Sequence, residues 1–173
     1  MDINLTLKDR LNLYNQYTIL QKLSQIQEDE YEARDYGLKA EIVLKGYIYD
    51  YYLLTDGFSD DFLPEDAKLV WDTLDMYSAI HSSYKKLKNP KLTREQITFY
   101  GLDGNYEIRS MVYCRFIIND LGRFTELSGN GHEEYNSHCR CCNKYSVMLE
   151  KWEAMGKPYE LSEEQIAKLI NVH

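Results

Sequence analysis

Apolar residues recur at spacings of three and four along most of the chain, which is the period of an amphipathic α-helix. The pattern is clearest between Ala67 and Leu87, where Trp71 and other large apolar residues fall on one face. Pro64 suits the first turn of a helix, and Asn89-Pro90 cannot continue one. The spacing therefore predicts a long helix between these two prolines.

The N-terminal third predicts a helical hairpin. Helical spacing covers residues 5–25, and the acidic segment 28–35 places Asp29 and Glu30 at the start of a second helix. The apolar spacing carries this second helix to about Tyr52. A polar cluster with one glycine then follows. We place an N-terminal hairpin at residues 1–58 and a C-terminal helical domain at residues 59–173; one continuous unit is the alternative.

The middle of the chain predicts one short element and one longer helix. Residues 93–96 have the spacing of a capping box, and the piece that they open is either a single turn or a short extended stretch. From Tyr106 to about Leu121 the spacing is helical again. If this helix continued further, Arg115 and Arg123 would share one face.

The C-terminal part predicts two more helices. Asn136 or Ser137 is placed to cap the first, and Gly156 is placed to end it. Residues 162–165 form a second capping box before the last helix. We therefore expect an all-α fold of six to seven helices, with a helix hairpin and a compact multi-helix domain.

Composition narrows the class of protein. The chain has 173 residues, 44% of them apolar, and a net charge of −8. That is enough apolar material for a core, and the acidic balance argues against nucleic-acid polymers and anionic membranes as partners. The N-terminus lacks the apolar region of a signal peptide, and no long apolar run could span a membrane. We expect a cytoplasmic protein with reduced thiols.

Common catalytic motifs are missing from the sequence. It contains no phosphate-binding GxxxxGK[ST], no dinucleotide-binding GxGxxG, no zinc-binding HExxH and no GxSxG. His81 and Ser83 lie two residues apart, so a helix would turn them away from each other. Paired acids such as Asp60-Asp61 fall in expected loops. We assign no catalytic residue and no cofactor, and an enzyme is the third alternative.

Five segments resemble the YfbU family of bacterial proteins, and together they span nearly the whole chain. They read RLNLYNQY, LDMYSAIHSSY, ITFYGLDGNYEIRSMVYCRFIINDLGRFTEL, KYSVMLEKW and YELSEEQIAKLIN. The long middle segment, residues 97–127, is the most specific. The resemblance implies an all-α fold, in which a helix hairpin is combined with a second helical domain, and homo-oligomers. It supplies no reaction. The HCRCC cluster at residues 138–142 and the acidic stretch 28–35 depart from the family pattern.

One candidate ligand site combines arginines with aromatic residues in and before the 106–121 helix. Arginine offers a rigid fork for phosphate or carboxylate, and aromatic rings stack on bases. These side chains could form a pocket for a small anionic or nucleotide-like ligand. Internal ion pairs with Glu107, Asp103, Asp120 or Glu126 and a subunit interface are the alternatives. The candidate residues are Arg109, Arg115, Arg123, Tyr100, Tyr113, Phe116 and Asn119.

Two further features concern tyrosine and cysteine. Sixteen tyrosines against five phenylalanines suit an interface, because tyrosine combines an apolar ring with a polar tip. Around a C-x-x-C pair, His138, Cys139 and Cys142 are weak candidates for a metal site. His132 or Cys114 would have to complete the four ligands of zinc. Ordinary cysteines at a helix start and a redox pair are the alternatives.

The sequence thus favours a YfbU-like cytosolic protein that self-associates and acts in binding or regulation without catalysis. Its main expected partner is another copy of itself. The alternative is a protein that holds or sequesters a nucleotide-like anion in the arginine and tyrosine region. In a phage-encoded chain, such sequestration would suit counter-defence.

Overall fold

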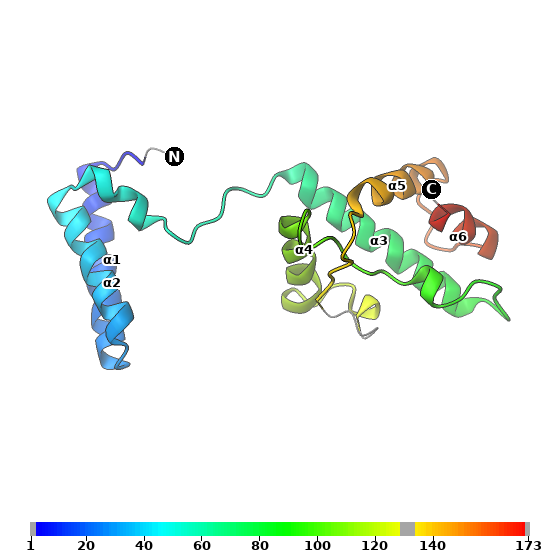
Figure 1. Ribbon diagram of the computed structural model, residues 1–173, viewed down its shortest axis with the longest axis horizontal. Coiled ribbons are helices and arrows are strands. Elements are labelled where there is room, and N and C mark those ends of the chain that lie inside the picture. Colours follow the sequence, from blue (N-terminus) through cyan, green and yellow to red (C-terminus); the bar gives the residue numbers. More distant parts are fainter. Residues whose placement is uncertain (1–2, 129–133, 172–173) are drawn as a thin grey trace. The chain divides into compact units, whose positions relative to one another are not determined.

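The computed structural model describes residues 3–128 and 134–171, and the chain divides into two compact units, Met1–Asp60 and Asp61–His173 (Figure 1). Helices build both units. Among the described residues the only β-type pairing is an isolated bridge between Leu102 and Asn136. The predicted all-α fold is confirmed.

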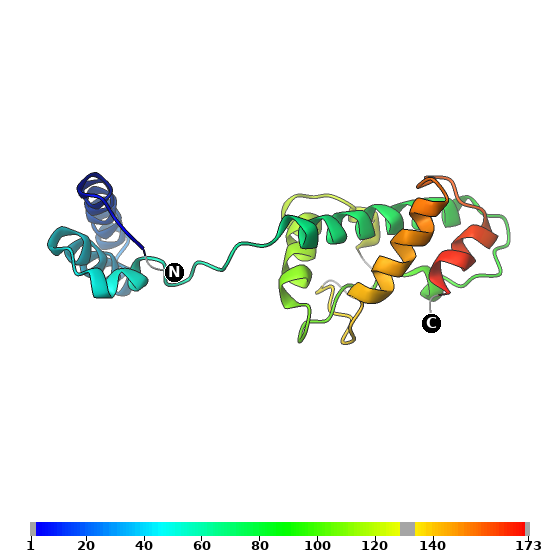
Figure 2. The ribbon, with the colours of Figure 1, turned by 90° about the horizontal axis from the view of Figure 1, so that it is seen from above.

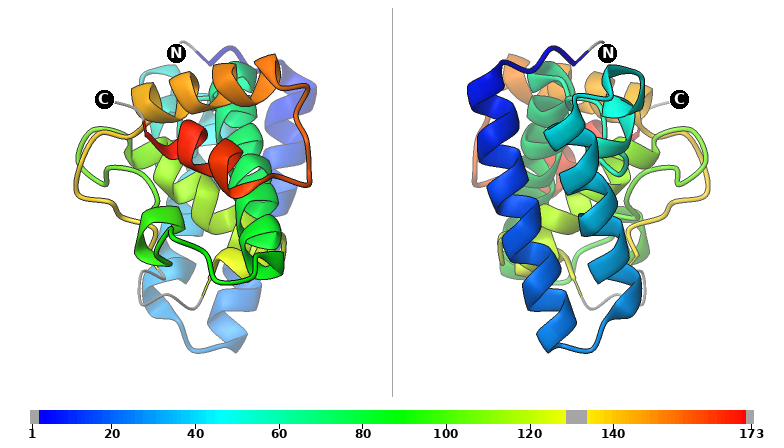
Figure 3. Two further views of the ribbon diagram at one scale, coloured as in Figure 1. Left: turned by 90° about the vertical axis from the view of Figure 1, so that its right-hand side faces the viewer. Right: turned by 90° about the vertical axis from the view of Figure 1, so that its left-hand side faces the viewer.

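The first unit is a hairpin of α1 (Leu7–Ile26) and α2 (Glu30–Lys45), which lie side by side (Figure 3). A capping box between Thr6 and Asp9 begins α1. The Asp29 side chain caps α2 by accepting a hydrogen bond from a backbone N–H in its first turn. The predicted role of Asp29 at the start of this helix is therefore confirmed.

The second helix ends earlier than its apolar spacing predicts. Gly46 adopts a left-handed conformation with φ of 71°, and its N–H binds the carbonyl of Ile42. Residues Ile48–Leu54 then form the 3₁₀ helix η1. The prediction that α2 runs to Tyr52 is wrong, because glycine enters the left-handed region without steric cost and stops the helix there.

Arg10 of α1 joins the two helices of the hairpin. Its Nε donates to the carbonyl of Val43 at 2.7 Å, and its Nη2 donates to that of Leu44 at 2.8 Å. The guanidinium thus satisfies two of the last carbonyls of α2 and places positive charge at the negative end of that helix. A Cβ at Gly46 would lie only 2.8 Å from the guanidinium carbon, so a larger residue there would have to displace the Arg10 side chain.

The second unit is organised by α3 (Pro64–Lys86), which contacts both α4 (Ile108–Arg115) and α5 (Cys142–Ala154) (Figure 2). Helix α5 in turn contacts α6 (Glu163–Ile170). The core of this unit includes side chains of α3 that have no solvent exposure. These are Leu74, Met76 and Ile80.

Several local signals in the second unit act as predicted. Pro64 begins α3, and the Ser162–Gln165 capping box begins α6. Thr93 and Gln96 bind each other reciprocally and open a single 3₁₀ turn, η2 (Glu95–Ile97), so the single-turn alternative is right. Gly156 follows α5 with φ of 81°.

Other boundaries differ from the prediction. After α4 the chain forms a π-helical turn, η3 (Phe116–Asp120), in which Leu121 N–H binds the Phe116 carbonyl. The short 3₁₀ helix η4 (Thr125–Leu127) comes next. Helix α5 begins at Cys142, so neither Asn136 nor Ser137 caps it, and that prediction is wrong. The Asn136 side chain instead accepts hydrogen bonds from the N–H groups of Gly104 and His138.

Replacing Arg10 with methionine should loosen the hairpin by about 2 kcal/mol, because two charge-assisted hydrogen bonds to carbonyls are lost while the apolar stem is kept. Hydrogen exchange at the C-terminal amides of α2 measures the effect. Arg34→Met, at an exposed position of α2, is the matched control. Equal exchange in the two variants would contradict the role assigned to Arg10.

Candidate functional site

One face of α4 packs against an aromatic cluster. Arg109 and Tyr113 lie one helical turn apart on this face. The Phe62 ring lies 4.9 Å from the Tyr113 ring, between centroids, and the Arg109 guanidinium stands 5.6 Å from the Phe62 centroid. Arg109 also donates to the backbone carbonyl of Asp61 at 2.6 Å. This arginine thus helps to hold the chain segment before α3 against α4.

The same cluster extends to α3. Trp71 Nε1 donates to the Tyr113 hydroxyl at 2.9 Å, and the Trp71 ring meets Phe124 edge-on, with 5.6 Å between centroids. The Phe116 ring stacks beside Tyr113 at 6.3 Å. Three of the candidate ligand residues therefore belong to one aromatic contact cluster that is partly open to solvent, because Arg109 and Phe116 are exposed and Tyr113 is only partly buried.

A second face carries Arg115 and Asn119. Arg115 Nη2 donates to the carbonyl of Glu134 at 3.1 Å, and the Tyr135 hydroxyl donates to Asn119 Oδ1 at 3.4 Å. The Nε atom of Arg115 is buried and has no hydrogen-bond partner among the described residues. This face joins the end of α4 and η3 to the chain just before α5.

The remaining two candidates lie elsewhere. The Tyr100 hydroxyl donates to the carbonyl of Glu95, and Arg123 is exposed. Arg115 and Arg123 do not share a helix face, because the helix ends before Gly122, which has φ of 63°. The structure thus distributes the seven residues over several places.

Glu107 makes a carboxylate contact that the sequence analysis does not find. Its oxygens accept hydrogen bonds from the N–H groups of Asp103 at 2.9 Å, Cys141 at 2.9 Å and Cys142 at 2.8 Å. The last two belong to the start of α5, so Glu107 caps that helix from a distant part of the chain. Partial burial raises the pKa of Glu107, but these hydrogen bonds outweigh it and hold the pKa below its ordinary value.

A backbone bridge supports this contact. Leu102 N–H binds the Tyr135 carbonyl, and Ser137 N–H binds the Leu102 carbonyl, both at 2.9 Å. A Cβ at Gly101, which has φ of 93°, would lie 1.9 Å from the Tyr135 carbonyl oxygen. Gly101 therefore allows the chain segment before α4 to approach the segment that contains Tyr135. The carbonyl of Gly101 also accepts a hydrogen bond from the Tyr145 hydroxyl at 2.7 Å.

The cysteine cluster differs from the predicted C-x-x-C arrangement. Cys139 and Cys141 are the close pair, with 3.8 Å between sulfurs. His138 lies before α5, which begins only at Cys142, so these two side chains do not share a helix face. Burial and the Glu107 carboxylate raise the pKa of Cys142 to about 12.

The two residues expected to complete a metal site lie elsewhere. Cys114 is buried in the core, which raises the pKa of its thiol to about 12, and His132 lies outside the described residues. Among the residues that are described, no three His, Cys, Asp or Glu side chains are grouped so that they could hold a metal ion.

His81 and Ser83 have separate environments. Ser83 donates to the carbonyl of Tyr159 and accepts from the N–H of Leu161, so it ties α3 to the chain before α6. His81 is half-buried, and its Nδ1 has no hydrogen-bond partner in the described part of the chain. Burial and the nearby charge of Lys85 lower the pKa of His81.

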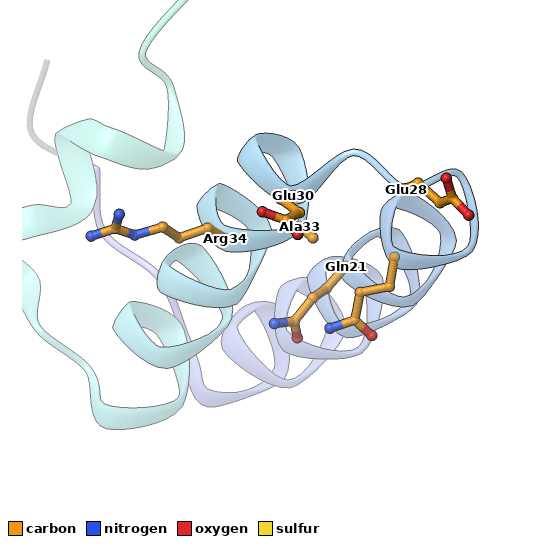
Figure 4. Close-up of a pocket in the computed structure, with 6 residues that line it drawn as sticks. Gln21, Glu28, Glu30, Ala33 and Arg34 are labelled. Atoms are coloured by element: carbon orange, nitrogen blue, oxygen red, sulfur yellow. The ribbon is translucent and has the colours of Figure 1, made fainter.

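A hollow of about 650 Å³ lies beside the turn of the hairpin. Figure 4 shows that Glu28 and Arg34 project in different directions there. A small-molecule site requires polar groups that converge on the ligand. The polar side chains of this lining do not converge on one point. The lining residues are Gln21, Gln25, Glu28, Glu30, Ala33 and Arg34.

An apolar flank of the hairpin is the more distinctive surface. Leu7 and Leu11 are one helical turn apart on α1 and are 78% and 59% exposed; Leu44 of α2 is 53% exposed. The three line one shallow hollow together with Arg10, Tyr14 and Val43. We call Leu7, Leu11 and Leu44 the apolar flank. Further apolar side chains are exposed on α1, and they include Ile19, Leu23 and Ile26.

The fold defines an all-α protein with a helical hairpin and a multi-helix unit. Within the described ranges, no helix has both the length and the apolar character needed to cross a membrane. Residues 3–172 match the model of the YfbU domain family. The chain therefore belongs to the YfbU family.

Glu107→Gln should lower the free energy of unfolding at pH 7 by about 2 kcal/mol, because an amide oxygen replaces a carboxylate that binds three N–H groups. The folded-state pKa of Glu107 is depressed, so its contribution is full above the ordinary value of 4.5 and is lost as the pH falls through the folded pKa. Denaturant unfolding at a series of pH values tests this.

Glu150→Gln, at an exposed position of α5, is the control for this prediction. It should change stability little at any pH. A gap between wild type and Glu107→Gln that stays constant down to pH 2 would show that the carboxylate charge does not matter.

Proposed function

We propose that this YfbU-family protein acts as a self-associating binding or regulatory protein without catalysis, and that the apolar flank of the hairpin meets a second copy of the chain. The observation that carries the proposal is the exposure of Leu7, Leu11 and Leu44 around one apolar hollow. Large apolar side chains that share a hollow on a helical surface are typical of an interface.

The small core of the hairpin unit supports this proposal. Its buried apolar cluster consists of Ile42, Val43, Tyr51 and Leu54 among the described residues. Two helices with so few buried side chains gain little hydrophobic free energy, so a further apolar surface is needed to stabilise them. A second hairpin would supply such a surface.

A second copy is the simplest occupant of the flank. In a two-fold dimer the same patch lies on both sides of the interface, so the flank of one copy would contact the flank of the other. Both helices contribute to the flank, and pairing would give a four-helix arrangement. Arg10 borders the hollow, and two of its N–H donors are already satisfied by carbonyls of α2 within the hairpin.

Exposed tyrosines on the hairpin unit agree with this proposal. Tyr77, Tyr135 and Tyr145 are buried in the second unit. Tyr31 and Tyr49 of the hairpin unit are exposed, and tyrosine is enriched at protein interfaces. Tyr51 is buried in the hairpin unit, and Tyr106 and Tyr159 are exposed in the second unit, so tyrosine serves both core and surface in each unit.

Leu11→Glu should weaken self-association at least about a hundredfold, because a two-fold interface would bury the new charge twice. Sedimentation equilibrium over a range of micromolar concentrations measures the dissociation constant. Circular dichroism checks that helix content is kept, as expected for a residue that is already 59% exposed.

Two matched variants make the assignment specific. Asn15→Glu puts the same charge at an exposed position one turn further along α1, and Leu23→Glu puts it at an exposed leucine outside the flank. Both should keep the oligomer. A monomeric wild type would refute self-association, and dissociation by Leu23→Glu but not by Leu11→Glu would move the interface away from the flank.

The second candidate function is binding of a small anion at Arg115. It is favoured by the buried Nε that has no partner within the described residues, because a bound phosphate or carboxylate oxygen would satisfy such a donor. Asn119 lies one turn further along the chain and supplies a polar neighbour.

An anionic ligand should raise the melting temperature of the wild type but not that of Arg115→Ala, because ligand binding stabilises the folded state by about 2.7 kcal/mol at a hundred times the dissociation constant. Calorimetry with an adenine dinucleotide, a cyclic nucleotide and inorganic phosphate tests this. Arg123→Ala, which removes an exposed arginine, is the control and should keep the shift. An unchanged wild type, or a shift that survives in Arg115→Ala, would refute an anion site at Arg115.

A further inference from the structure

Three cysteines at the start of α5 have different environments. Cys139 is exposed, Cys141 is buried, and Cys142 lies between these extremes. The sulfurs of Cys139 and Cys141 are 3.8 Å apart. A disulfide bond is about 2.05 Å long, so these two sulfurs need to approach by less than about 2 Å.

We propose that Cys139 and Cys141 form a redox-responsive dithiol, which a small disulfide of the glutathione class converts into an intramolecular disulfide. Cys139 is the thiol that meets the oxidant, because it is the exposed member of the pair. Cys141 is the thiol that completes the bond, because it is buried beside Cys139 and sheltered from solvent.

Hydrogen bonds fold the segment so that the two thiols meet. Ser137 Oγ donates to the carbonyl of Cys139 at 2.7 Å, and Cys141 Sγ donates to the same carbonyl at 3.2 Å. The N–H of Cys141 is held by Glu107. The sulfur of Cys141 is therefore held on the side of the loop where Cys139 lies, and Cys139 itself precedes α5.

The structure also separates Cys142 from this pair. Burial and the adjacent Glu107 carboxylate raise the pKa of the Cys142 thiol to about 12, so that thiol stays protonated at neutral pH. Cys114 is enclosed in the core of the second unit. Burial raises the pKa of the Cys141 thiol as well, so the 3.8 Å between the sulfurs of Cys139 and Cys141, and not thiol acidity, singles out this pair.

The thiol–disulfide exchange takes place in two steps. The Cys139 thiolate attacks one sulfur of the small disulfide, forms a mixed disulfide and expels the first small thiolate. Cys141 then loses its proton and attacks the Cys139 sulfur, which forms the internal bond and expels the second small thiolate. The protein loses two electrons and two protons, and the small disulfide is reduced to two thiols.

Equilibration of the reduced protein with mixtures of glutathione and glutathione disulfide tests the proposal. Alkylation then traps free thiols, and mass spectrometry with peptide mapping locates the bonds. Wild type and Cys142→Ser should each lose two alkylatable thiols and contain a bond between residues 139 and 141. Cys141→Ser should instead keep one glutathione on Cys139, and Cys139→Ser should keep none.

Denatured wild type is the positive control for oxidation, and circular dichroism confirms that each variant is folded. The proposal is overturned by a bond between residues 139 and 142, by a glutathione adduct that persists on the wild type, or by thiols that stay free in the folded protein while the denatured protein is oxidised. Loss of the internal bond in Cys142→Ser would overturn it as well.

Discussion

The carboxylate of Glu107 is the contact on which the arrangement of the second unit depends. It binds N–H groups of Asp103 in its own loop and of Cys141 and Cys142 at the start of α5. The first N–H groups of a helix have no partner within the helix, so a half-buried helix start needs an acceptor from elsewhere. Glu107 lies just before α4, so its side chain fixes where α4 and α5 begin relative to each other. Gly101 allows the backbone bridge between Leu102 and Asn136 to form beside this contact.

The hairpin is organised by a similar contact at the opposite end of a helix. Arg10 binds carbonyls near the end of α2, as Glu107 binds N–H groups at the beginning of α5. The two units differ in what surrounds these polar contacts. The second unit encloses its contact beside a large core, whereas the hairpin leaves the leucines next to Arg10 exposed. This difference is the physical basis for proposing that the hairpin, rather than the second unit, carries the interface with a partner.

The sequence predicts those parts of the fold that depend on neighbouring residues. Pro64, the pair Ser162 and Gln165, and the glycine at position 156 act over a few residues, and each has the predicted role. The end of α2 is different, because the apolar spacing continues through Gly46 and hides the left-handed turn. The π-helical turn after Arg115 also keeps an apolar spacing, so the sequence alone suggests one longer helix.

The candidate sites depend even more on contacts between residues that are far apart in the sequence. Helical spacing places Arg109 and Tyr113 on one face, but nothing near them in the sequence indicates that Phe62 and Trp71 cover that face. Glu107 and Cys141 are 34 residues apart, so their bond has no local signal. The cysteine motif is misleading for a related reason: a C-x-x-C spacing suggests that Cys139 and Cys142 pair, but only the folded chain brings Glu107 to Cys142.

The capping contact and the raised pKa of Cys142 share one cause, the Glu107 carboxylate. A carboxylate held ionised by backbone N–H groups must lie at the start of α5, and the cysteine that begins this helix is then exposed to its negative charge. The same charge that stabilises the helix start suppresses the thiolate of Cys142. Cys139 precedes the helix and lies outside this contact, whereas Cys141 gives its N–H to the same carboxylate. A change at Glu107 would consequently alter both the support of the α5 start and the surroundings of the Cys142 thiol.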